Sequence, residues 1–152
     1  MADALQKTAT EIKFGDPDTR LAQTEHWTVL LRPKQPTLGS LVLICREPVR
    51  SFAEVSPPAY AEMRDVVRRI EATLREVVRY ERINYLMLMM VDPDVHFHVI
   101  PRYEGTRQLG TTEFRDAGWP GPPVLDAAVS PDTATGAALL AQLRAAWLRC
   151  SG

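Results

Sequence analysis

The sequence predicts an α+β fold, in which an antiparallel sheet of about five strands is joined by one long helix and a C-terminal helix. Two observations lead to this class. First, 152 residues with 45% hydrophobic and 24% charged side chains are typical of one globular domain with a single core. Second, the predicted elements follow one another in the order hairpin, helix, hairpin, helix, which is an α+β pattern.

Charge and composition exclude several classes of protein. The chain has 18 Lys and Arg against 19 Asp and Glu, which is not the basic balance of a nucleic-acid-binding protein. No apolar run reaches the ~18 residues of a membrane span, and the N-terminal stretch lacks the apolar segment of a signal peptide. We therefore expect a cytoplasmic protein with no membrane or nucleic-acid partner. Cys45 and Cys150 have no C-x-x-C partner, which excludes zinc-finger and thioredoxin-like proteins.

The first half of the chain predicts a hairpin followed by the long helix. Residues 1–23 are polar and are expected to form a flexible arm or a loosely packed first strand. The β-branched and aromatic residues 25–31 predict a strand, and the apolar run 41–45 predicts a second strand that is buried on both faces. Ser56 is a suitable N-cap, and apolar residues recur every three or four positions up to Val78, which predicts about six helical turns.

The second half predicts another hairpin and the last helix. Residues 83–90 are apolar at both parities, which indicates a central strand covered on both faces. After a turn at residues 92–94, a further strand is expected over 95–100, where Pro101 stops it. The Gly- and Pro-rich residues 104–123 are expected to form a surface loop with Phe114 and Trp119 as anchors. The last helix is expected to open at residues 130–132 and to end near residue 149.

The strand over residues 95–100 carries two of the three histidines of the chain. Side chains alternate across a strand, so Asp94, His96 and His98 share one face, and Val95, Phe97 and Val99 face the core. Arg102 has the parity of the histidines if the strand continues through Pro101. One face then carries a carboxylate, two imidazoles and a guanidinium in a row.

Three interpretations of this face are open. It is a solvated polar surface with two incidental histidines, or it is a metal site formed by Asp94, His96 and His98. In the second case His26 is the only other histidine that can add a ligand. In the third interpretation, a neutral imidazole attacks phosphorus and forms a covalent nucleotidyl-histidine, while the second imidazole and the arginine hold the phosphate oxygens.

The stretch VHFHVIPR resembles the second half of the His-x-His-x-His signature of the histidine-triad family. Its Pro-Arg ending is similar to the fragile-histidine-triad branch. Residues 38–44 resemble the Gly-His-apolar strand of that family, and residues 45–52 resemble the loop that follows it. The resemblance covers roughly residues 25–103, so we expect one domain over 1–152, with this core followed by a C-terminal loop and helix over 104–150.

The resemblance implies both a chemistry and a set of site residues. The family consists mostly of homodimers that bind purine nucleotides and break a bond at the α-phosphorus of dinucleoside polyphosphates or nucleoside phosphoramidates. His96 matches the nucleophile, His98 matches the third histidine, and Arg102 matches an arginine beside the phosphate. No resident cofactor or metal is implied, although a divalent cation can accompany the substrate phosphates. The loop residues Arg32, Lys34 and Gln35 are candidates to contact the nucleotide, and Tyr103 or Trp119 can stack on a base.

Three positions depart from the family pattern. Asp94 stands in place of the first histidine, Ser40 stands where a histidine follows the glycine, and the Gly-Gln loop before the signature is missing. A carboxylate about 7 Å from a phosphate charge costs roughly 2.4 kcal/mol at an effective dielectric constant of ~20. That energy corresponds to about fiftyfold weaker anion binding. The sequence therefore predicts a nucleotidyl hydrolase or transferase, with a non-catalytic nucleotide sensor and a metalloprotein as alternatives.

Overall fold

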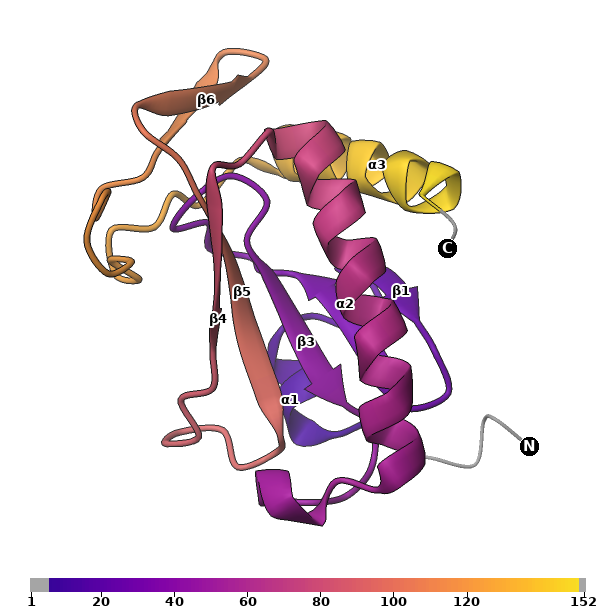
Figure 1. The fold of residues 1–152 in the computed structure, drawn as a ribbon. Helices are drawn as coiled ribbons and strands as arrows, with labels where there is room; N and C mark the ends of the chain where they lie inside the picture. Colours follow the sequence, from indigo (N-terminus) through magenta and orange to yellow (C-terminus); the bar gives the residue numbers. More distant parts are fainter. Residues whose placement is uncertain (1–5, 151–152) are drawn as a thin grey trace.

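The computed structural model describes residues 6–150, which form a five-stranded antiparallel sheet with helices on both faces (Figure 1). The strand order is β1-β2-β3-β5-β4. The sheet strands are β1 (Arg20–Gln23), β2 (Trp27–Leu31), β3 (Leu41–Cys45), β4 (Arg82–Leu86) and β5 (His96–Arg102). The helices are α1 (Ala9–Lys13), η2 (Phe52–Glu54), α2 (Pro57–Val78) and α3 (Thr133–Arg149). The α+β class with its five-stranded antiparallel sheet is thus confirmed.

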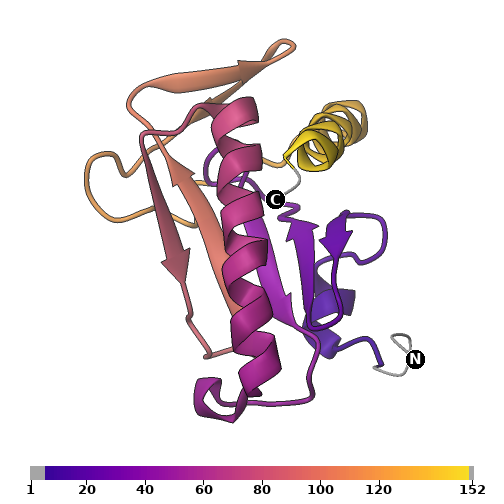
Figure 2. The ribbon, with the colours of Figure 1, turned by 45° about the vertical axis from the view of Figure 1, so that its right-hand side comes forward.

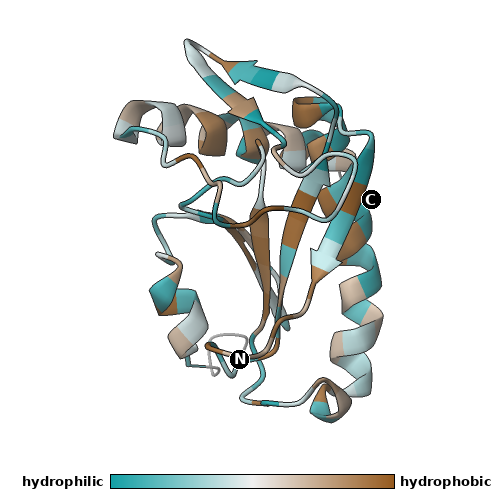
Figure 3. Cartoon of the chain, turned by 90° about the vertical axis from the view of Figure 1, so that its left-hand side faces the viewer, coloured by the Kyte–Doolittle hydropathy of each residue, from teal (hydrophilic) through white to brown (hydrophobic). Residues whose placement is uncertain are grey.

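Helix α2 covers one face of the sheet, and the short helix α1 lies on the other (Figures 1 and 3). Ser56 caps α2 by accepting a hydrogen bond from the backbone N–H of Ala59, as the sequence predicts. The apolar stripe of α2 faces the sheet, and α3 packs beside α2 at one end of the molecule (Figure 2). None of the helices in the described residues is both long enough and apolar enough to span a membrane.

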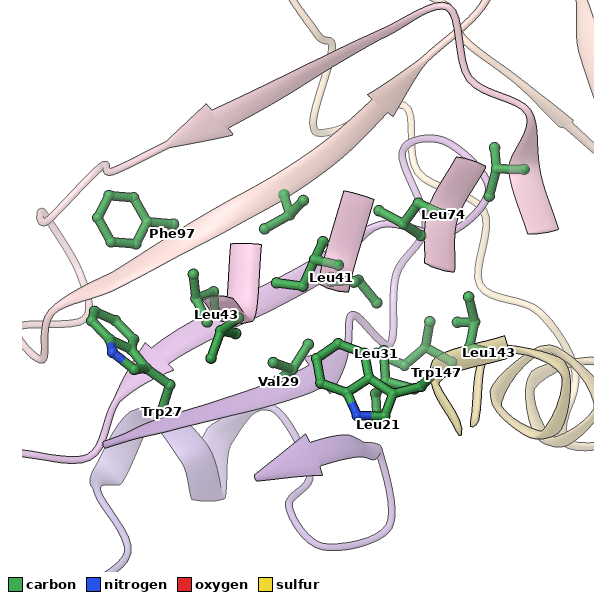
Figure 4. Packing of buried hydrophobic residues seen from close by; sticks show 14 of the residues in the cluster. Leu21, Trp27, Val29, Leu31, Leu41, Leu43, Leu74, Phe97, Leu143 and Trp147 are labelled. Carbon is green, nitrogen blue, oxygen red and sulfur yellow. The ribbon is translucent and has the colours of Figure 1, made fainter. Parts of the chain in front are cut away.

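The main core lies between the sheet and α2, with α3 closing one side (Figure 4). Alternate residues of the strands point into it, among them Trp27, Val29, Leu43 and Phe97. The opposite face of the sheet holds a small second cluster, formed by Leu30, Val42 and Ile44 with Phe14, and α1 covers part of it.

The histidines lie on the second face, away from α2. In the register of β3 and β5, Ile44 is opposite His96 and Val42 is opposite His98. Side chains directly opposite in an antiparallel pair lie on the same face. The predicted alternation along β5 is therefore confirmed, because both imidazoles share the face of the small second cluster.

Two strand predictions are wrong in detail. The apolar run 83–90 was expected to be a central strand, but β4 is the edge strand and ends at Leu86. Beyond it the chain leaves the sheet, with a φ of 49° at Met89. Strand β5 continues through Pro101 to Arg102, because β3 has no residue paired beyond Val99 and the missing N–H of the proline breaks no bond of that ladder.

The segment expected to be only a loop contains a hairpin, and the N-terminal segment contains a helix as well as a strand. Strands β6 (Thr106–Leu109) and β7 (Thr112–Arg115) form a separate two-stranded sheet. Phe114 is fully buried, as expected of an anchor, and Trp119 is partly buried. The strand alternative for residues 1–23 is confirmed by β1, whereas residues 1–5 lie outside the described part of the chain.

Candidate active site

A cleft of about 410 Å³ opens on the face of the sheet that carries the histidines. The sheet supplies its floor, α1 one wall, and the connection between β4 and β5 the other. Its lining residues are Lys13, Phe14, Arg32, Leu88, Met89, Met90, Val91, Asp92, His96 and His98. Of the residues that the sequence singles out for chemistry, the cleft brings together His96, His98 and Arg32.

His96 is held in a defined orientation at the floor of the cleft. Its ring is buried, and Nδ1 lies 2.6 Å from the backbone carbonyl oxygen of Asp94. A carbonyl oxygen only accepts hydrogen bonds, so Nδ1 must carry the proton. In the neutral ring Nε2 then holds the lone pair, and it has no hydrogen-bond partner among residues 6–150. This is the tautomer that a nucleophilic imidazole requires.

His98 lies next to His96 and presents a hydrogen-bond donor where His96 presents a lone pair. The two ring centroids are 5.2 Å apart in an edge-to-face arrangement, and Phe14 packs edge-on against His98 at 5.9 Å. Burial, and then the nearby charge of Arg32, lower the pKa of His98 to about 4, so the ring is neutral near pH 7. Arg32 Nε points at Nδ1 of His98 over a long 3.4 Å, which leaves the ring proton on Nε2 as a donor.

The mouth of the cleft is formed by residues that the sequence analysis did not assign to a functional site. Lys13 donates to both carboxylate oxygens of Asp92 at 2.8 and 2.9 Å, and this ion pair joins α1 to the connection before β5. Leu88, Met90 and Val91 leave large apolar surfaces exposed there. A sequence signal for α1 does exist, because Thr8 and Glu11 form a capping box of the pattern Thr-x-x-Glu.

Asp94 does not project into the cleft beside the histidines. Its Oδ2 accepts hydrogen bonds from Thr10 Oγ1 at 2.8 Å and from the Thr10 backbone N–H at 3.2 Å. The carboxylate thus fixes α1 to the start of β5, while the backbone carbonyl of the same residue orients His96. The electrostatic cost expected from sequence spacing is reduced, because the carboxylate points away and is compensated by hydrogen bonds.

Ser40 and Gln35 shape the connection between β2 and β3 and are not among the residues that line the cleft. Gln35 Oε1 accepts from the backbone N–H groups of Gly39 and Ser40, and its Nε2 donates to the carbonyl oxygens of Arg32 and Ser40. Ser40 is fully buried, with Oγ donating to the carbonyl oxygen of Thr37 at 2.8 Å. Their expected contact with the nucleotide is replaced by contacts inside this loop.

Arg102 also makes its contacts within the protein and does not line the cleft. It makes a bidentate ion pair with Asp116 at 2.7 and 3.0 Å and donates to Asn84 Oδ1 and to the carbonyl oxygen of Gly121. This buried arrangement ties the segment after β7 to β5 and leaves the guanidinium outside the cleft lining. Tyr103 is likewise packed, because its hydroxyl bridges the Leu38 N–H and the Phe114 carbonyl.

The donor atoms of the metal alternative are not assembled. The carboxylate of Asp94 is bound to Thr10 and does not line the cleft with His96 and His98. In the part of the chain that the structure describes, the residues that meet with metal-ligand spacing are Glu25, His26 and Glu62, at the other end of β2. The arrangement of His96 and His98 therefore fits acid–base and nucleophilic chemistry better than metal binding.

Comparison with known proteins identifies the family and the fold. The family model of the HIT domain matches residues 14–105, which is more than half of the chain. Histidine-triad proteins of known structure from Bradyrhizobium japonicum and Sinorhizobium meliloti superpose with a TM-score of 0.73 each. Their sequence identities are 18% and 19%, and the alignments cover 93% and 94% of this chain and 96% and 97% of theirs.

A third structure, of a hypothetical histidine triad nucleotide-binding protein from Sulfolobus tokodaii, matches with a TM-score of 0.65 at 17% identity, over 86% of this chain and 84% of that one. No curated protein sequence matches the chain. The extent of the family match, together with two histidines of the signature on β5, shows that the chain belongs to the histidine-triad (HIT) family of nucleotide-binding hydrolases and transferases.

Proposed function

We propose that the protein is a nucleotidyl hydrolase or transferase that acts at the α-phosphorus of a purine nucleotide through a covalent nucleotidyl-histidine at His96. The observation that carries the proposal is the hydrogen bond from His96 Nδ1 to the Asp94 carbonyl. It fixes the ring so that the Nε2 lone pair is available in a cleft large enough for part of a nucleotide.

The reaction takes two displacements at phosphorus. In the first, the lone pair of His96 Nε2 forms a bond to the α-phosphorus, and the bond from phosphorus to the leaving group breaks and leaves its electron pair there. In the second, the oxygen of water, or of another acceptor, attacks the phosphorus and the N–P bond breaks. The lone pair returns to Nε2, and the proton of the attacking group goes to solvent. His98 Nε2–H donates a hydrogen bond to an oxygen on phosphorus as charge develops.

The walls of the cleft suit the two parts of a nucleotide. Phe14 and the exposed apolar residues Leu88, Met90 and Val91 offer surfaces for a base. Arg32 lies beside His98 and supplies positive charge to the phosphate. Asp92, the acidic residue of the lining, is neutralised by its ion pair with Lys13.

A homodimer and a cytoplasmic location are part of the same proposal. The family resemblance supports a dimer, and light scattering at the monomer mass would contradict it. Cys45 is buried as a free thiol, which is in keeping with a reducing compartment. A divalent cation can accompany the substrate phosphates, and measuring the rate with and without EDTA tests whether one is needed.

A nucleotide sensor without turnover is the second candidate function. The observation that favours it is the apolar lining that the connection after β4 gives to the cleft, where the family resemblance leads us to expect a phosphate-binding Gly-Gln loop. Micromolar binding of a nucleotide in calorimetry, with no adduct and no product, would support the sensor and reject the hydrolase.

The test is release of AMP from diadenosine tetraphosphate or adenosine 5′-phosphoramidate by the native protein, by His96→Asn and by His26→Gln. His26 is a matched control, because it lies outside the cleft lining and beside Glu62. We expect at least about a hundredfold loss of rate for His96→Asn and an essentially native rate for His26→Gln. Equal rates for the native protein and His96→Asn would reject the proposal.

A further inference from the structure

A second cavity of about 430 Å³ adjoins the cleft, and Arg32 lines both. Its other lining residues are Lys34, Leu125, Asp126, Ala128 and Ser130. The residues beyond position 105 that form its wall lie outside the range matched by the family model. This wall therefore lies outside the part of the chain that carries the family signature.

The wall is firmly attached to the loop that carries Arg32 and Lys34. The backbone N–H of Gln35 donates to the Val129 carbonyl at 2.8 Å, and the Val129 N–H donates to the Gln35 carbonyl at 2.9 Å. Arg32 Nη1 in turn donates to the Lys34 carbonyl at 2.9 Å. The segment between β7 and α3 is thus held beside the β2–β3 loop as it returns past the sheet toward α3 (Figure 1).

The charge of this second cavity suits an anion. Two cations, Arg32 and Lys34, line it against one carboxylate, Asp126, which is exposed. Neither cation has a carboxylate partner within ion-pair distance among residues 6–150, so both charges are available to a ligand. The cavity is also less apolar in its lining residues than the cleft, which is walled by Phe14 and the Leu88–Val91 stretch.

We propose that this cavity is a subsite for the phosphate chain that leaves the α-phosphorus, so that the preferred substrates are nucleotides with further phosphates beyond the first. The proposal rests on the proposed function and names the substrate class of that site. A substrate with its α-phosphorus at His96 places its base against the apolar wall and extends its remaining phosphates past Arg32 toward Lys34.

The state of His98 supports the same substrate class. A neutral imidazole with its proton on Nε2 donates a hydrogen bond, but full transfer of that proton would leave an imidazolate. Burial and the Arg32 charge lower the pKa of His98 to about 4, so no imidazolium is present near pH 7 to protonate a leaving amine. A phosphate chain departs as an anion without that proton, whereas the amine of a phosphoramidate needs one.

The test compares the affinities of AMP and ATP by calorimetry in the native protein and in Lys34→Gln, Lys34→Arg, Ala128→Trp and Ala127→Trp. Ala127 is the matched control for Ala128, because it is exposed and is not part of the cavity lining. We expect the native protein to prefer ATP by about tenfold, as one added phosphate contact with a cation suggests. Lys34→Gln and Ala128→Trp should lose this preference, whereas Lys34→Arg and Ala127→Trp should keep it.

Equal affinities for AMP and ATP in the native protein, or a preference that Lys34→Gln leaves intact, would overturn the subsite. The rates with diadenosine tetraphosphate and adenosine 5′-phosphoramidate then separate the two proposals. Lys34→Gln should lower kcat/KM about tenfold for the first and less than about twofold for the second. An equal loss for both substrates contradicts the subsite. If the native protein turns over neither substrate faster than His96→Asn does, the catalytic proposal is rejected. The preference for ATP over AMP in calorimetry still tests the subsite in that case.

Discussion

The buried ring of His98 should make the stability of the protein depend on pH between about 4 and 6.5. Burial, followed by the charges of Arg32, His96 and Lys13, lowers its pKa in the folded state from 6.5 to about 4, and Asp92 opposes this shift. Below pH 6.5 the unfolded chain binds a proton at His98 that the folded protein does not bind. The free energy of unfolding therefore falls as the pH drops through this window, and the loss is complete near pH 4.

The size of the effect follows from the two pKa values. At about 1.4 kcal/mol for each pH unit, the interval from 6.5 to about 4 corresponds to a loss on the order of 3 kcal/mol at the acidic end. Urea unfolding of the native protein and of His98→Gln at several pH values between 4 and 7.5 measures it. We expect the difference in stability between the native protein and His98→Gln to shrink toward acidic pH. A His98→Gln curve that runs parallel to that of the native protein would refute the reasoning.

Three further substitutions test the structural assignments, each by urea unfolding. Asp94→Asn weakens the acceptor for both Thr10 hydrogen bonds and should lower the free energy of unfolding by about 1.5–3 kcal/mol. An unchanged midpoint of urea unfolding would show that this contact does not fix α1. Gly39→Ala should lower the free energy of unfolding by about 1–3 kcal/mol, because φ is 84° and an added Cβ would lie 2.6 Å from a methyl carbon of α2. An unchanged stability would contradict that close approach. Arg102→Met leaves the carboxylate of Asp116 buried without its partner and should cost about 3–5 kcal/mol. The KM of this variant should stay near the native value. A large rise in KM with native stability would instead indicate that Arg102 contacts the substrate phosphate.

The strand that carries the histidines could be predicted from the sequence because period-two alternation is a local property. Residues on one parity of β5 are apolar and face the core, so the parity of His96 and His98 followed directly. The fate of Arg102 could not be predicted in the same way. Its parity is as expected, but its partner Asp116 lies 14 residues later, beyond a hairpin, and the sequence does not show that these two side chains meet.

Helix α1 illustrates a second limit of local patterns. Five residues are too few for a stable isolated helix, so the helix depends on contacts with the rest of the protein. Thr10 bonds to Asp94, 84 residues away, and Glu11 accepts a hydrogen bond from Thr28 on β2. Phe14 and Lys13 reach the cleft only because these long-range contacts exist, although the capping box at its start was visible in the sequence.

The run of apolar residues after Ile83 shows how a correct pattern can mislead. Apolar residues at both parities are typical of a central strand, yet β4 lies at the edge, and apolar residues that follow it in the run line the cleft. Position in the sheet depends on which strands pair, and pairing is a property of the whole chain. Met87 and Met89 pack against the core, whereas Met89 and Met90 line the cleft, and hydropathy alone does not distinguish these surroundings.

The most direct test of the catalytic role of His96 is mass spectrometry of the protein quenched with base within milliseconds of mixing with diadenosine tetraphosphate, because a phosphorus–nitrogen bond to histidine survives alkali better than acid. We predict a single adenylyl group on the intact protein, mapped by peptide fragmentation to the imidazole at position 96 and missing from His96→Asn. Steady release of AMP with no adduct at that residue, or an adduct on another side chain, would contradict the mechanism.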